Sequence, residues 1–152
     1  MQETIKHHNE LSGALFCPSA QPGLAGSMII GVVEAHPKAS RVSHLARPVT
    51  LSGQNLAALN DDPGATARFR FGAPCQEMAC TNWTGSKCRV AQQLVRILPA
   101  RGQALPRCSL RRVCRWFEQE GAEACMRCSQ VVTDDEGFEA ALNGASLSIS
   151  CG

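Results

Sequence analysis

The chain has 152 residues, 44% of them hydrophobic and 18% charged, and a formal charge of +2. This composition excludes a disordered or fibrous protein, and the length suits one domain, over 1–152, with a sizeable core. The longest apolar run, 28–33, is too short to cross a bilayer, so we predict no membrane partner. Residues 1–23 lack the apolar stretch of a secretory signal, so we expect a cytoplasmic location.

The first half of the chain predicts short elements separated by turns. Residues 1–26, which carry Cys17, lack periodicity and end in a stretch rich in glycine and proline, so we expect them to be irregular. The later patterns predict a strand over 27–34, a short strand over 41–45, a brief helix over 52–60, and a strand over 66–71.

The second half predicts helices around the cysteines. Apolar residues at helical spacing predict one helix over 88–98, which ends at Pro99, and another over 108–120, which ends at Gly121. We expect a turn over 122–128, a short strand over 130–133 and a loosely held tail over 134–152. The fold class predicted is α+β: a small single domain of short strands and helices organised around cysteine-ligated sites.

Seven of the nine cysteines lie in one stretch of about fifty residues, in two groups. The first group is Cys75, Cys80 and Cys88, and the second is Cys108, Cys114, Cys125 and Cys128. In a reducing compartment such grouping favours metal binding over disulfides, and an odd total also fits poorly with a fully paired disulfide framework.

The second group has the spacing C-x5-C-x10-C-x2-C. A helix that ends at Gly121 would allow the chain to reverse, which would bring Cys125 and Cys128 back to Cys108 and Cys114. Four converging thiolates suit either a [4Fe–4S] cluster or a zinc ion.

The first group supplies only three thiolates, and Cys17 is the candidate for the fourth. The Cys17-Pro18 step is similar to the Cys-Pro that ends ligand runs in bacterial ferredoxins, although this resemblance covers two residues only. A small buried hydrophobic side chain is the alternative role for Cys17, and it is the expected role for Cys151.

Structural zinc sites usually use two tight C-x2–4-C pairs, and Cys75/Cys80 and Cys125/Cys128 could serve as such pairs. They would leave Cys88, Cys108 and Cys114 unexplained, so the irregular spacing favours iron–sulfur clusters over zinc. Eight cysteines also divide into two sets of four. We therefore expect two [4Fe–4S] clusters, with zinc as the alternative cofactor.

Positive charge is concentrated around these cysteines. Residues 68–127 contain eleven Lys or Arg and four Glu, a balance of +7, whereas the remainder carries −5. Such charge would compensate an anionic cluster, and it would also attract a phosphate backbone. The sequence therefore predicts electron transfer or redox or oxygen sensing with a redox partner protein; the alternative is a zinc- or cluster-binding basic module that recognises nucleic acid. No catalytic motif is present, which favours a protein without enzymatic activity of its own.

Overall fold

The computed structural model describes residues 14–35 and 40–132, which form a small mixed α/β domain. Its centre is an antiparallel sheet in the order β1-β4-β2-β3. The strands are β1 (Phe16–Ala20), β2 (Met28–Glu34), β3 (Arg41–Thr50) and β4 (Phe69–Pro74). The helical elements are α2 (Gly53–Asn60), α3 (Ala65–Arg68), η1 (Glu77–Ala79), α4 (Arg89–Ile97), η2 (Arg111–Val113), α5 (Arg115–Glu120) and α6 (Ala122–Cys128).

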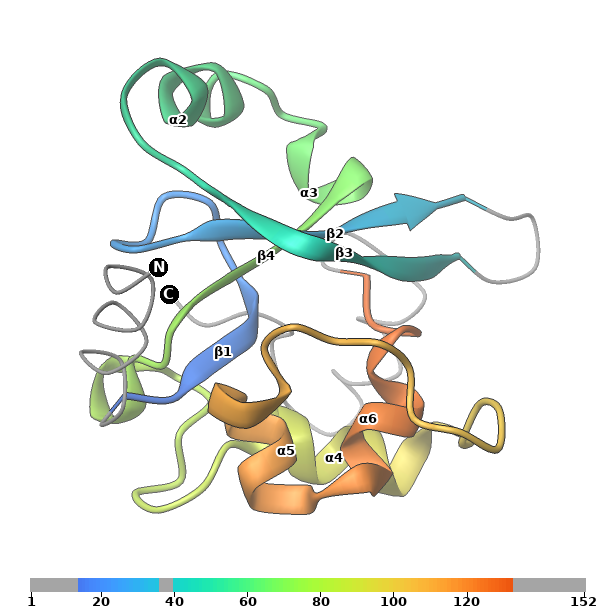
Figure 1. Cartoon of the computed structure of the whole chain (residues 1–152). Coiled ribbons are helices and arrows are strands. Elements are labelled where there is room, and N and C mark those ends of the chain that lie inside the picture. The colour runs from blue at the N-terminus through green and yellow to red at the C-terminus, as the bar shows by residue number, and fades with distance from the viewer. Residues whose placement is uncertain (1–13, 36–39, 133–152) are drawn as a thin grey trace, which may run out of the picture.

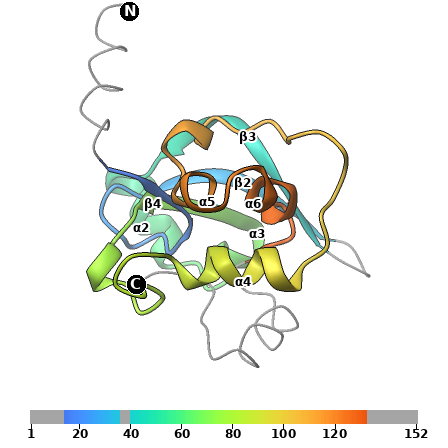
Figure 2. The same cartoon turned by 90° about the horizontal axis from the view of Figure 1, so that it is seen from below.

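The helices lie on both sides of the sheet. Helices α2 and α3 lie above the strands in Figure 1, and α4, α5 and α6 lie below them. Figure 2, seen from below, shows these three helices in front of the sheet. They pack on one another, and α5 also contacts β1. The cysteine-rich half of the chain therefore forms a helical layer against the sheet.

The main core lies within this helical layer and includes two of the cysteines. It contains Cys88 and Cys114 with Leu94, Trp116 and Val131, all of them buried. Helix α4 contributes through its apolar face, as its spacing predicts, because residues three and four apart share one side of a helix. The cysteines thus belong to the packed interior instead of a loose surface loop.

Several predicted elements are confirmed, and their ends have local causes. The strand over 27–34 is β2, the helix over 52–60 is α2, and the helix over 88–98 is α4. Helix α2 begins after Ser52, whose backbone N–H donates to Asn55 Oδ1 at 2.7 Å. The strand predicted over 41–45 is correct but longer, since β3 continues to Thr50.

Other predicted elements differ from the structure. The segment 1–26 is not irregular throughout, because it contains β1; residues 1–13 lie outside the described residues. Residues 65–68 form α3 before β4 begins, so the strand predicted over 66–71 starts too early. The turn expected over 122–128 is helix α6. Residues 130–132 are not a strand, and 133 and the tail 134–152 lie outside the described residues.

The helix predicted over 108–120 is divided at Cys114. Its first part contains only the short η2, and α5 begins after Cys114. Cys114 itself has extended backbone angles, φ −80° and ψ 126°, and pairs with Phe16 in a parallel bridge. An extended residue cannot continue a helix, so pairing with β1 overrides the helical periodicity here. Gly121 ends α5 at φ +66°, which agrees with its predicted role as a helix stop.

Within the part of the chain that the structure describes, no helix is long and apolar enough to cross a membrane.

Candidate metal centre

Strand pairing brings Cys17 to the first cysteine group. Cys17 on β1 lies opposite Ala73 on β4, and the Cys75 backbone N–H donates to Leu15 O at 2.8 Å. Cys17 and Cys80 are buried together, with Cys75 packed against them. Cys17 therefore lies next to Cys75 and Cys80, as its predicted role as the fourth ligand of the first group requires.

Helix α5 holds Cys88 near this group. The Cys88 N–H donates to Gln119 Oε1 at 2.7 Å, and Gln119 Nε2 donates to Cys88 O at 2.9 Å. Burial raises the pKa of the Cys88 thiol to about 11, and a charge on the neighbouring Cys17 raises it further. Cys88 and Cys17 are thus close enough to interact electrostatically.

The second group is assembled from three adjacent segments. Cys108 precedes η2, Cys114 separates η2 from α5, and Cys125 and Cys128 lie on α6. Burial raises the pKa of Cys114 to about 12, with smaller contributions from Cys128 and Cys108. The pKa of Cys128 is also raised, mainly by burial and further by Cys108 and Cys125. Cys114 and Cys128 are therefore each within electrostatic range of Cys108 and of one another, and Cys125 is within range of Cys128.

A buried arginine connects the second group to the sheet. Arg70 of β4 is only 1% exposed. Its Nη2 donates to Cys128 Sγ at 3.1 Å, its Nη1 to Cys128 O at 2.5 Å, and its Nε to Pro18 O at 2.6 Å. The guanidinium therefore places a positive charge beside one candidate ligand and lowers the pKa of that thiol, against the effect of burial.

His44 of β3 also reaches the second group. Its Nε2 lies 3.9 Å from Cys128 Sγ. Burial, Arg70 and Arg111 lower its pKa to about 4, so the imidazole is neutral at physiological pH. A neutral imidazole is the form that binds metal ions, so His44 is a further candidate donor.

Trp116 lies between the two groups. Its ring carries the Arg70 guanidinium at 5.3 Å from the ring centroid. Its indole nitrogen is close enough to Cys88 to lower that thiol's pKa, yet Nε1 makes no hydrogen bond of ordinary geometry with the described residues. The side chain is 2% exposed, so this donor is buried. The Trp116 side chain thus lies beside Cys88 of the first group and beside Arg70, which donates to Cys128 of the second group.

The residues that the structure describes do not form a ready-made site for a metal ion. Within 14–35 and 40–132, no three side chains of His, Cys, Asp or Glu are arranged to hold one. None of the eight cysteines in these ranges forms a disulfide. Cys151 lies outside the described residues. Ligation by the two groups therefore stays a prediction.

Two of these neighbours, Arg70 and His44, were missed by sequence reasoning. Arg70 alternates with Phe69 and Phe71, a pattern that normally leaves the polar residue exposed. His44 lies 84 positions from Cys128, and no local spacing connects the two. Their roles follow from strand pairing and helix packing, and no signal in the sequence indicated them.

Comparison with known protein families, curated proteins and solved structures finds no match to this chain. A functional proposal therefore depends on the residues described above.

Proposed function

We propose that this protein binds two iron–sulfur clusters, each through four cysteines, and uses them in electron transfer or redox sensing. One set is Cys17, Cys75, Cys80 and Cys88, and the other is Cys108, Cys114, Cys125 and Cys128. The observation that carries the proposal is the joining of Cys17 to the first group. Strand β1 brings it across more than fifty residues of sequence to pack with Cys80 and Cys75, while Cys88 lies in the adjoining core with Cys114.

The environment of the sulfurs favours metal ligands over ordinary core cysteines. Two of them accept hydrogen bonds from N–H groups: Asn82 N donates to Cys80 Sγ at 3.4 Å and Arg70 Nη2 to Cys128 Sγ at 3.1 Å. The buried Nε1 of Trp116 beside Cys88 has no hydrogen-bond partner among the described residues. A buried donor without an acceptor is costly, and an anionic sulfur at this point would satisfy it.

The raised thiol pKa values point the same way. Without a nearby cation, burial keeps Cys88 and Cys114 protonated at neutral pH. A bound metal supplies the positive charge that deprotonates its thiol ligands. A metal bound at Cys88 or Cys114 would thus supply the charge that ionises the thiol, which burial alone opposes.

Clusters are preferred to zinc on the ligand spacing. Cys75/Cys80 and Cys125/Cys128 have the spacing of the tight pairs in structural zinc sites, but zinc sites built on them would leave Cys88, Cys108 and Cys114, at separations of five, seven and ten residues, without a role. A cluster would supply one-electron chemistry, and this chain's residues would bind it, exclude water and adjust its charge balance. Arg70, with its buried positive charge, would stabilise the reduced, more negative state of a cluster at the second group and so raise its reduction potential.

The nucleic-acid alternative has weaker support. Of the ten arginines in 68–127, Arg70 is buried, Arg68, Arg115 and Arg127 form ion pairs, and Arg111 donates to Pro106 O. Half of these ten arginines are therefore engaged within the protein. This leaves fewer of them to bind a phosphate backbone.

The test is anaerobic purification followed by iron, acid-labile sulfide and zinc analysis per chain. Two clusters predict about eight iron and about eight sulfide, with a visible absorption band. Cys17→Ala should remove about half of the iron, as should Cys114→Ala, whereas Cys151→Ala is the matched control and should retain all of it. A colourless protein with stoichiometric zinc and no sulfide would overturn the proposal. So would a Cys17→Ala variant with full iron content.

A further inference from the structure

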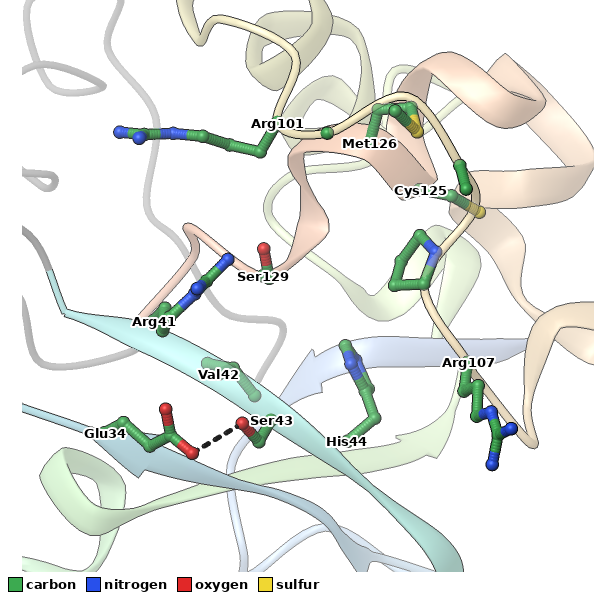
Figure 3. Close-up of a pocket in the computed structure, with 13 residues that line it drawn as sticks. Glu34, Arg41, Val42, Ser43, His44, Arg101, Arg107, Cys125, Met126 and Ser129 are labelled. Atoms are coloured by element: carbon green, nitrogen blue, oxygen red, sulfur yellow. Dashed lines mark hydrogen bonds between the residues drawn. The ribbon is translucent and has the colours of Figure 1, made fainter.

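A pocket opens beside the second cysteine group. It has a volume of about 410 Å³, which is in the range of small-molecule sites. Strand β3, the end of α6 and the loop between α4 and η2 form its walls (Figure 3). The lining side chains that matter here are Arg41, His44, Arg101, Arg107, Cys125 and Ser129.

The charge of this pocket is strongly positive. Arg41, Arg101 and Arg107 line it, and among the residues that the structure describes Glu34 is the one carboxylate that does so. The Glu34 carboxylate already accepts a hydrogen bond from Ser43 Oγ at 2.8 Å, drawn in Figure 3. In the described ranges, none of the three guanidinium groups forms an ion pair with an acidic side chain. Their donors are thus available to a ligand.

The arginines come from two separate parts of the fold. Arg41 extends from β3 toward the end of α6, near Ser129, whereas Arg101 and Arg107 belong to the loop and their side chains extend outward from it in different directions (Figure 3). The loop is held in place, because the Arg101 N–H donates to Met126 O at 2.8 Å and Arg111 donates to Pro106 O. A ligand that engages both sides must therefore carry more than one anionic group.

We propose that this pocket binds a small polyanion with two or more carboxylate or phosphate groups. Guanidinium groups recognise both kinds of oxyanion through paired hydrogen bonds. The pocket's volume and its walls on three sides suit a small molecule better than a nucleic-acid backbone, which needs an extended basic surface.

The ligand would lie next to the candidate metal centre. Cys125 forms part of the pocket wall, and His44, on the opposite wall, approaches Cys128 Sγ at 3.9 Å. Anion binding does not require a cluster, so this inference stands apart from the proposed function. If both are correct, the pocket is where a charged small molecule would meet the second group.

The experiment measures binding to the full-length protein, purified anaerobically, by isothermal titration calorimetry. The probes are pyrophosphate and citrate, with glycerol as the uncharged control. The double variant Arg41→Gln/Arg107→Gln should weaken binding of the preferred probe by roughly tenfold or more, since two charge-assisted contacts are lost. Arg96→Gln is the matched control: Arg96 is exposed on α4, does not line the pocket, and should bind normally.

Each outcome has a defined meaning. Preference for pyrophosphate assigns the site to phosphates, and preference for citrate assigns it to carboxylates. Failure of both probes to bind the wild-type protein would overturn the proposal. Equal weakening by Arg96→Gln would also overturn it, because it would show diffuse attraction to a basic surface. So would tighter binding of a short DNA duplex that the pocket variants leave unchanged. Circular dichroism of each variant checks that the fold is retained.

Discussion

Replacing Arg70 with methionine tests the connection between the sheet and the second cysteine group. Methionine has a similar length and fills much of the space, but it donates no hydrogen bonds. Pro18 O and Cys128 O would each lose a buried donor, at a cost of about 1–3 kcal/mol per group. Removing a buried charge offsets part of this loss. We expect the free energy of unfolding to fall by about 2–4 kcal/mol.

The assay is thermal unfolding of the metal-free protein under reducing conditions. For a chain of this length, each kcal/mol lowers Tm by about 2–4 °C, so Arg70→Met should lower it by roughly 5–15 °C. Arg70→Lys keeps the charge but cannot reach Pro18 O and Cys128 O together, and an intermediate Tm is expected. The exposed Arg89→Met is the control and should change Tm by less than about 2 °C.

Two results would refute this reasoning. A Tm of Arg70→Met equal to that of the wild type would show that the bonds contribute nothing to stability. Full stability in Arg70→Lys would show that charge alone matters and that the forked geometry does not. In the metal-loaded protein, the methionine variant should also have a lower reduction potential at the second group, since a positive charge beside Cys128 is lost.

Three further predictions concern the two cysteine groups and the sheet. The free energy of unfolding of the metal-free protein should keep its full contribution from the Cys88 and Cys114 thiols below pH 9 and lose it between pH 9 and about 11–12, because these thiols ionise at lower pH in the unfolded chain than in the folded one. Denaturant titrations at alkaline pH measure this decline, and it should be flatter in the alanine variants of the two cysteines. Gln119→Ala removes both hydrogen bonds to the Cys88 backbone and should lower the free energy of unfolding by about 1–3 kcal/mol in urea; an unchanged midpoint would contradict this. Gly31→Ala would set a Cβ 2.6 Å from Val42 Cγ1 and should cost about 1–3 kcal/mol in the same assay, with Gly23→Ala, whose Cβ would meet only Asn60 Oδ1 at 4.0 Å, as the control.

The sequence predicted local elements well where periodicity and end signals agree. Helix α4 combines an apolar face with Pro99 beyond its end, and β2 is a β-branched run bounded by glycine. The prediction of one helix over 108–120 was wrong, although the apolar residues do have helical spacing. Cys114 pairs with the backbone of Phe16 instead, and this pairing interrupts the helix. Local pattern cannot indicate a partner almost a hundred residues away.

For the candidate site, the sequence could predict which cysteines form each group but not how they are arranged or which other side chains adjoin them. The cysteine count and spacing indicated two groups, and the reversal at Gly121 brings α6 back against α5, as Figure 2 shows. The approach of Cys17 was a hypothesis, since it depends on the register of β1 against β4. Arg70 and His44 could not be predicted at all, because their importance comes from burial against a helical layer whose position the sequence does not give.

The two cysteine groups differ in how much chain must fold before each is complete. The second group lies within 108–128, whereas the first extends from Cys17 to Cys88 and closes only when β1 pairs with β4. Contacts between residues distant in sequence form late, because the loop entropy must be overcome before they contribute stability. During refolding, the cysteines of the second group should therefore approach one another before Cys17 joins the first group, although the pairing of Cys114 with Phe16 also requires β1. During synthesis, Cys17 leaves the ribosome 71 residues before Cys88, so among the cysteines of the two proposed sets it has the longest interval before the last member of its own set is made.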